Sequence, residues 1–273
     1  MQHHVFIAGV ALWSPQLPGW EAARAILRGD RSPDPDAATR PAATLLAPTE
    51  RRRAPDSVAV ALEVAASACQ DAQLDPARLS SVFASTHGDL AVTDSLCETL
   101  AKAPQLTSPT KFHNSVHNAA AGYWTIGSKC LRPYTAVSAW HHTFAAGLLE
   151  ATSQAIVQQE PILYVAYDIA ARGPLSTMAQ SGSLLAAALV LAPDYSSAAT
   201  TRMTWSTRPS ASPTLSVSRP TNEALVAGNA MAGCLPLFEA LATNQACELT
   251  YAAAPRLELA LALQPVRAET RAA

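Results

Sequence analysis

Four of the seven histidines lie in two tight groups, and imidazoles at such spacing are able to do chemistry. His113 and His117 are four residues apart, and His141 and His142 are adjacent. Two imidazoles at positions i and i+4 share one face of a helix and can bind a metal ion, but no acidic third ligand lies nearby in the sequence. We therefore expect no metal site here.

The second pair of histidines lies where a strand is expected to turn into a helix. At such a helix N-terminus the backbone dipole disfavours the imidazolium cation, which suits His141 to act as a general acid or base. A structural role is the alternative, in which these histidines hydrogen-bond within a packed turn or an interface. The residues alone leave both interpretations open.

Sequence motifs that mark the common enzyme classes do not occur in the chain. The sequence contains no G-x-G-x-x-G dinucleotide loop, no phosphate loop of the Walker type, no H-E-x-x-H zinc motif and no G-x-S-x-G nucleophile turn. No cofactor is therefore expected.

Short apolar runs alternate with segments of helical periodicity along the first two thirds of the chain, which predicts a layered α/β fold with buried strands. After residue 193 the composition shifts to Ser, Thr, Pro and Ala, with one alternating segment around residues 203–205. Strands are predicted at 5–12, 81–86, 135–139, 161–168, 184–191, 248–252 and 257–263, and helices at 20–27, 58–72, 93–101, 118–128, 143–158 and 235–242.

Composition excludes several classes of partner. Nineteen Lys and Arg against 21 Asp and Glu give a net charge of −2, so nucleic acid and anionic membranes are poor candidates. Charged residues make up 15% of the chain, below the roughly 25% of typical soluble domains, which indicates that another subunit covers part of the surface. The five cysteines are widely spaced without a C-x-x-C pair, and no apolar run reaches the length of a membrane span. We expect a cytoplasmic protein.

The segment from Asn118 to Gly147 resembles the β-ketoacyl synthases of the thiolase superfamily. It carries Asn118, Ala121-Gly122 and Pro133, then a short strand, then a sharp turn into a helix, in the order found in that family. The first strand with Ser14-Pro15 and the strand ending at Asp168 also match, so the resemblance covers residues 4–192. It implies a thiolase-like α/β fold with a mixed sheet, essentially half a ketosynthase.

Departures from the family pattern are as informative as the matches. The resemblance places His141 where an active ketosynthase has its nucleophilic cysteine, and an imidazole cannot carry the acyl thioester as a thiolate does. No histidine follows His142, so both histidines of the family's catalytic set are missing. The chain 1–273 is thus expected to be a single truncated domain in which 193–265 form a reduced C-terminal cover and 266–273 a frayed tail.

A ketosynthase-like chain without a nucleophile is similar to a chain-length factor, the subunit that pairs with an active ketosynthase and shapes its acyl tunnel. More narrowly, Ser108–Trp124 and Phe144–Ala151 resemble the short β-ketoacyl synthase, N-terminal-like proteins of aryl polyene and xanthomonadin-type pigment pathways. The resemblance implies a catalytic ketosynthase and an acyl carrier protein as partners. Eight residues are expected at the interface or acyl tunnel: Phe112, His113, Asn114, Val116, His117, Asn118, Trp140 and Phe144.

Two other functions remain open at this point. The first is a small acyltransferase or hydrolase, in which His141 or His142 is the general base for Ser138 or Ser115. Asp168 or Asp89 would orient that base, and all three side chains must then lie within hydrogen-bond reach. The second is a stand-alone homodimer that only binds an acyl chain or a carrier protein.

Overall fold

In the computed structural model, which describes residues 2–177, 181–210, 215–226 and 228–266, the strands join into one mixed sheet. The strand order is β4-β3-β5-β6-β1-β7-β9-β8, with β2 added to the end of β1. β3 runs parallel to both β4 and β5, and the other neighbours are antiparallel. The strands are β1 (His3–Ser14), β2 (Leu17–Pro18), β3 (Ser80–Ala84), β4 (Tyr134–Val137), β5 (Ile162–Asp168), β6 (Leu185–Ala192), β7 (Thr201–Pro209), β8 (Cys247–Ala254) and β9 (Leu257–Pro265).

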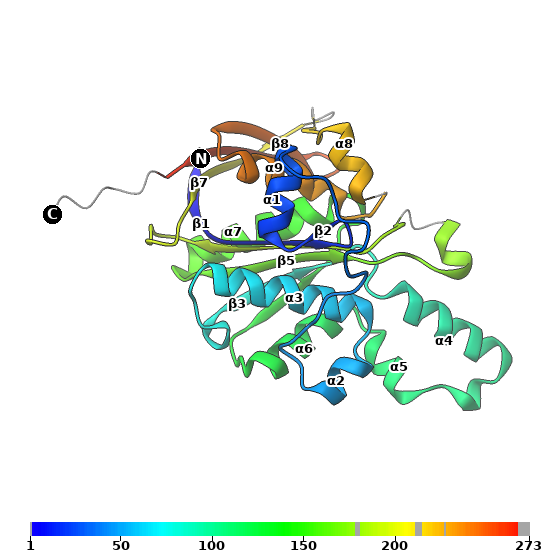
Figure 1. The fold of residues 1–273 in the computed structure, drawn as a ribbon. Coiled ribbons are helices and arrows are strands. Elements are labelled where there is room, and N and C mark those ends of the chain that lie inside the picture. The colour runs from blue at the N-terminus through cyan, green and yellow to red at the C-terminus, as the bar shows by residue number, and fades with distance from the viewer. Residues whose placement is uncertain (1, 178–180, 211–214, 227, 267–273) are drawn as a thin grey trace.

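Helices cover both faces of this sheet (Figure 1). On one face α3 packs over the central strands β1, β5 and β6, and α6 lies beside it over β3 and β4. On the other face α1, α7 and α9 form the second apolar core. The described helices are α1 (Trp20–Arg28), α2 (Pro48–Arg53), α3 (Asp56–Asp71), α4 (Leu90–Lys102), α5 (Pro109–Asn114), α6 (Ala119–Ser128), α7 (Thr143–Gln158), α8 (Pro220–Glu223) and α9 (Leu235–Thr243).

Because both faces are covered, the central strands are buried along their whole length. Every residue of β5 and β6 is buried, as expected for strands that lie between two helical layers. In β7, which lies nearer the β8 edge of the sheet, the first residues alternate between buried and more exposed side chains. The layered α/β fold with a mixed sheet is therefore confirmed.

Gly9 shows how closely the α3 layer packs on the sheet. The pairing of β1 with β6 shifts register between Ile7 and Gly9, and a Cβ atom at position 9 would lie 2.2 Å from the carbonyl oxygen of Ala68 on α3. Only glycine allows this approach without moving a helix backbone.

Most predicted elements are confirmed to within a few residues, but β7 was predicted only in part and the short elements β2, α2, α5 and α8 were missed. The sequence showed only a short alternating segment around 203–205, whereas β7 extends over Thr201–Pro209. Its nine residues all pair with β9, so pairing with a distant strand overrides a composition rich in Ser, Thr and Pro. Among the missed short elements is α5, whose N-terminus is capped by Ser108. Of the predicted tail 266–273, only Val266 lies within the described residues.

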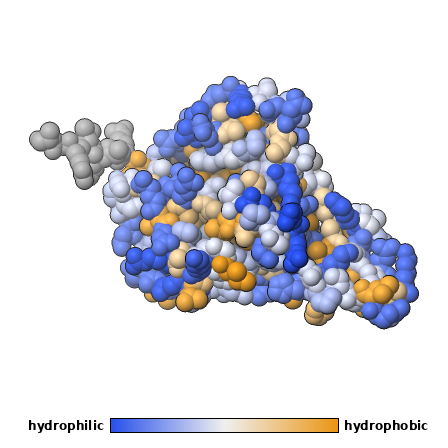
Figure 2. Space-filling view, turned by 60° about the horizontal axis from the view of Figure 1, so that its bottom comes forward, coloured by the Kyte–Doolittle hydropathy of each residue, from blue (hydrophilic) through white to orange (hydrophobic). Residues whose placement is uncertain are grey.

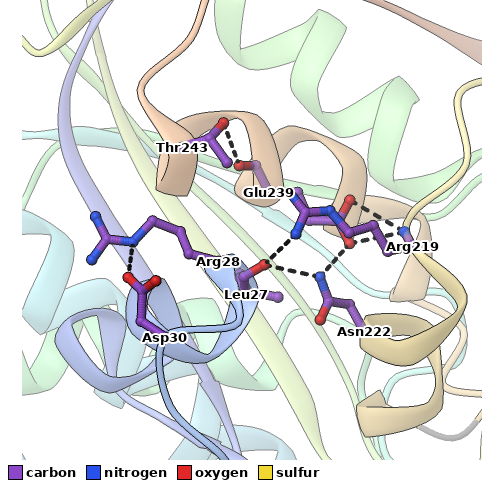
Figure 3. A network of polar contacts seen from close by, with 7 residues as sticks. All are labelled: Leu27, Arg28, Asp30, Arg219, Asn222, Glu239 and Thr243. Carbon is purple, nitrogen blue, oxygen red and sulfur yellow. Dashed lines mark hydrogen bonds and ion pairs between the residues drawn. The ribbon is translucent and has the colours of Figure 1, made fainter.

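A hydrogen-bond network around the buried carboxylate of Glu239 connects α9 and the segment before α8 to the first helix, α1 (Figure 3). The Glu239 carboxylate on α9 accepts hydrogen bonds from the backbone N–H of Arg219 at 3.1 Å and from Asn222 Nδ2 at 2.8 Å. Arg219 and Asn222 also donate to the carbonyl oxygen of Leu27 at the C-terminal end of α1. The network thus satisfies a carbonyl that α1 itself leaves unpaired.

Replacing Glu239 with Ala is expected to lower the free energy of unfolding by about 2 to 3 kcal/mol, because two donors lose a charged acceptor. Urea titration of the full chain measures this change. Glu248, an exposed carboxylate on β8, is the matched control, and Glu248→Ala should change stability by no more than about 0.5 kcal/mol. Equal effects of the two substitutions would contradict the structural role of the network.

Candidate functional site

The carboxyl ends of the parallel strands β3, β4 and β5 meet at one edge of the sheet, where ligands bind in open α/β sheets. At this edge the chain leaves β4 and enters α7 through one sharp turn, Trp140–His142. The Thr143 hydroxyl fixes the turn, since it accepts from the Ala139 N–H at 3.0 Å and donates to the Trp140 carbonyl at 2.7 Å. The predicted strand, turn and helix are therefore present.

Trp140 has the unusual backbone conformation of this turn. Its φ of 52° lies in the left-handed region, which non-glycine residues rarely adopt and which costs energy that the surrounding structure must supply. The strained position is therefore Trp140, one residue before His141. Its indole ring is half exposed at the surface of the turn.

A pocket of about 450 Å³, which we call the turn pocket, opens beside this residue. The Trp140 ring meets the His87 ring edge to face at 5.4 Å between centroids and the His141 ring at 5.0 Å. Two imidazoles and an indole thus share one wall. The turn pocket is lined by Thr86, His87, Trp140, His141, Glu223, Gly228, Asn229, Ala230 and Ala232.

Asp168 holds the loop that carries His87. Its fully buried carboxylate accepts from Ser85 Oγ at 2.8 Å and from the backbone N–H groups of Thr86 and His87 at 2.9 and 3.2 Å. Burial raises the pKa of Asp168 above its ordinary value, although these hydrogen bonds act to lower it. The backbone carbonyl of Asp168 accepts from Asn229, so the same residue also anchors a lining segment of the turn pocket.

The histidines that the sequence grouped are separated by the structure. α5 ends at Asn114, so His113 and His117 do not share a helical face. His117 Nε2 lies 2.7 Å from the Ser85 carbonyl oxygen, whereas His113 is exposed and lies beside the Tyr123 ring. Among the described residues no group of three or more His, Cys, Asp or Glu side chains is placed to hold a metal ion. The i, i+4 spacing therefore does not bring these two imidazoles together on one helix.

The residues of the possible hydrolase triad make other hydrogen bonds. Ser138 donates to the Thr86 carbonyl at 3.0 Å, and Ser115 donates to the Phe112 carbonyl at 2.8 Å. His142 Nδ1 lies 3.2 Å from the carbonyl oxygen of Ala252 on β8.

The two candidate acids are also engaged elsewhere. Asp168 holds the loop after β3, and Asp89 accepts from Ser57 at 2.6 Å and caps α4. The described hydrogen bonds therefore assemble no Ser-His-Asp triad from these residues.

Of the eight residues expected at an interface or tunnel, some are exposed and some lie inside the chain. Phe112 has 66% of its surface exposed, and Val116 and Trp140 are also open to solvent. Asn118 donates to the Tyr134 hydroxyl at 2.9 Å on the edge strand β4. Asn114 and Phe144 are buried: Asn114 accepts from Tyr123, and Phe144 packs against Tyr164 and Tyr251. The last two thus add no exposed surface.

Phe112 and Val116 belong to a projecting part of the chain, residues 90–116, which we call the arm. In Figure 1 α4 extends away from the layered body, with α5 between its far end and α6. α4 buries only Leu96 and α5 only Asn114. Figure 2 shows hydrophobic surface at the end of the arm and over the body along the same face. The arm leaves apolar side chains uncovered within this chain.

Sequence reasoning did not find His87, Glu223 or Asn229 as lining residues of the turn pocket. His87 had a usable signal, because it follows β3 at the same carboxyl edge where β4 turns into α7. Glu223 and Asn229 had none, since they come from a segment without periodicity that folds back to this edge.

Comparison with known proteins gives the family and the fold. The model of the β-ketoacyl synthase N-terminal domain family matches residues 26–255. Curated proteins contain no match to the chain.

Solved ketosynthase structures have the same fold as this chain. The complex of the ketosynthase ApeO with its chain length factor ApeC from Xenorhabdus doucetiae is similar, with a TM-score of 0.69 and 20% identity over 94% of this chain and 98% of that chain. The AntDE:AntF ketosynthase complex with its acyl-carrier protein gives a TM-score of 0.73 at 11% identity, covering 97% of this chain and 100% of that one. The ishigamide ketosynthase/chain length factor gives 0.64 at 14% identity, with coverage of 97% and 100%.

These similarities agree with the arrangement at the carboxyl edge of the sheet, where a strand, a sharp turn and a long buried helix follow one another. The family model spans most of the chain, from α1 to the end of β8. The chain therefore belongs to the β-ketoacyl synthase N-terminal domain family and has its thiolase-like fold.

Proposed function

We propose that this protein is a non-catalytic subunit of the chain-length-factor type, which pairs with an active β-ketoacyl synthase and shapes its acyl tunnel. The observation that carries the proposal is the apolar surface of the arm and of the neighbouring elements α6 and β4. The pair would extend polyene or polyketide chains on an acyl carrier protein.

Most of the large exposed apolar side chains of the described residues gather in this one region of the chain. Leu131, just before β4, has 99% of its surface exposed. Exposed apolar side chains concentrated in one region mark a protein interface more often than scattered ones do. The exposed apolar residues of the region are Leu100, Leu106, Phe112, Val116, Ile126, Leu131, Tyr134 and Trp140.

The edge strand β4 adds hydrogen-bonding capacity to this surface. β4 pairs only with β3 among the described strands, so its other side presents backbone N–H and C=O groups. The opposite edge strand, β8, is partly covered, because Ser216 exchanges two hydrogen bonds of 2.9 Å with the Thr250 backbone. A partner subunit that covers the arm would lie against the open edge.

Cysteine placement supports a non-catalytic role. No cysteine lies in the turn Trp140–His142. Burial raises the pKa of Cys69 and of Cys234 to about 12, so neither is a thiolate near neutral pH. Cys97 lies on α4, Cys130 precedes β4 and Cys247 lies on β8, so none of the three belongs to this turn.

We propose that the chains extended by the pair are aryl polyenes. This part of the proposal is supported by the resemblance of Ser108–Trp124 and Phe144–Ala151 to proteins of aryl polyene pathways and by the similarity to the ApeO and ApeC complex.

We extend the proposal to the domain organisation, in which 193–265 form a reduced cover on a single ketosynthase-like unit. No described helix is long and apolar enough to span a membrane. A cytoplasmic location stays a prediction.

Co-purification with candidate ketosynthases of the same cell tests the proposal, followed by analysis of carrier-protein-bound products with the wild type and with His141→Ala. We expect a heterodimer whose product length depends on this chain and survives His141→Ala. Turnover of an acyl substrate by the isolated chain, abolished by His141→Ala, would instead support the small acyltransferase or hydrolase. A stable symmetric dimer that ignores every ketosynthase would support the stand-alone binding protein.

A further inference from the structure

A second pocket, which we call the α1 pocket, lies beside the first helix and has no part in the proposed pairing. Its volume is about 550 Å³, within the range of small-molecule sites. Segments far apart in the sequence line it: one side of α1, the connection from β6 to β7, the C-terminal end of α9 and the C-terminal end of α3. Its principal lining residues are Trp20, Arg24, Arg28, Asp71, Leu241 and Asn244.

The walls of the α1 pocket are held by contacts within the fold. The Val10 N–H donates to Asp71 Oδ2 at 2.8 Å, at the end of the irregular stretch of β1. Trp20 packs edge to face on Phe238 with ring centroids 5.8 Å apart. Thr200 N–H donates to the Ile7 carbonyl at 3.0 Å and fixes the β6–β7 connection. A ligand would therefore enter a site that is already formed.

Two arginines, Arg24 and Arg28, line this pocket from successive turns of α1. Arg28 Nε is paired with Asp30 at 2.8 Å, which holds the guanidinium while its terminal nitrogens remain available (Figure 3). Arg24 makes no ion pair with any described residue. Guanidinium groups bind carboxylates through two parallel hydrogen bonds, so the pair forms a receptor for an oxyanion.

The other lining residues of the α1 pocket narrow the class of ligand. The Asp71 carboxylate lines the pocket with one oxygen already engaged by Val10. A negative charge there repels a dianion more strongly than a monoanion. Trp20 and Leu241 provide apolar lining beside the arginines. The lining therefore suits a compact monocarboxylate with an apolar body better than a phosphate ester.

We propose that the α1 pocket binds a small organic monocarboxylate, with the carboxylate at Arg24 and Arg28 and the apolar body against Trp20 and Leu241. The pocket is independent of the pairing proposed above, because α1 contacts β1, β2 and α9 whereas the arm lies at the β4 end of the sheet. Failure of either proposal leaves the other unaffected.

Isothermal titration of the full chain with benzoate tests this site, with phenyl phosphate as the dianion and benzyl alcohol as the uncharged analogue. Benzoate is expected to bind at least tenfold more tightly than either. Arg24→Gln combined with Arg28→Gln should weaken benzoate binding at least tenfold. Arg52→Gln, on the exposed helix α2, is the matched control and should leave it unchanged.

Tryptophan fluorescence provides a second test of benzoate binding, which does not depend on whether the arginine variants fold. Benzoate should change the tryptophan emission of the wild type and not that of Trp20→Phe. Absence of benzoate binding at 10 mM, about ten times the concentration that half-saturates a site with a Kd of 1 mM, would overturn the proposal. Equal binding to the wild type and to a folded double arginine variant would overturn it as well.

Discussion

Replacing Asp168 with Ala is expected to lower the free energy of unfolding by about 3 to 4 kcal/mol, because three donors lose one charged acceptor. Ser85 Oγ and the backbone N–H groups of Thr86 and His87 all donate to this carboxylate. Urea titration measures the change. Asp194→Ala, at an exposed carboxylate after β6, is the control and should be nearly neutral. An equally small effect at Asp168 would contradict its role as the anchor of the turn pocket.

The pH dependence of Asp168→Asn is a second readout of the same residue. Burial raises the pKa of Asp168 in the folded state, so the folded protein binds this proton more tightly than the unfolded chain does. The resulting stabilisation is complete below the ordinary aspartate pKa, about 4, and is lost as the pH rises through the folded-state value. The unfolding free energy of the wild type minus that of Asp168→Asn should therefore increase as the pH falls from 7 to 4. A difference independent of pH would contradict the raised pKa.

The combined substitutions Phe112→Asp and Val116→Asp are expected to weaken pairing with a ketosynthase at least 100-fold, which corresponds to about 2.7 kcal/mol. Both side chains are exposed in this chain, so the folded subunit should lose little stability. In the pair, each new carboxylate would be buried against an apolar surface without a partner, and that desolvation is costly. Titration of the purified subunits against each other measures the affinity.

Val217→Asp is the matched control for the arm. Val217 is 82% exposed, and it follows Ser216, which pairs with β8 at the other end of the sheet. We expect normal pairing and normal product length for this variant. Loss of pairing in Val217→Asp together with intact pairing in the arm variant would place the interface at the β8 edge of the sheet and would contradict the proposed interface at the arm.

Elements with a strong local pattern could be predicted from the sequence. The helix 143–158 is confirmed at both ends, because its apolar residues recur at helical spacing and a sharp turn precedes it. β5 and β6 were recognisable as continuous apolar runs, which is typical of strands covered on both faces. β7 could not be predicted in full, because its stability comes from pairing with β9, about fifty residues further along the chain.

The candidate site was predictable only in part. The sequence placed a turn between the predicted strand 135–139 and the predicted helix 143–158 and singled out His141, which lines the turn pocket. It did not show that His87 meets Trp140, or that Asp168 holds the loop between them, since these residues are more than 25 positions apart. Hydrogen bonds between the ends of different strands leave no periodic signal in the sequence.

The sequence by itself determined the order of the ketosynthase-like elements, the lack of a cysteine in the turn after β4 and the lack of any histidine after His142. These properties depend on residue identity and on local periodicity, which are visible without a structure. Tertiary structure alone decided that α5 stops at Asn114, that Trp140 takes the left-handed conformation, and that the arm keeps its apolar side chains exposed. Those properties depend on which distant segments pack together, and packing between distant segments is set by the whole fold.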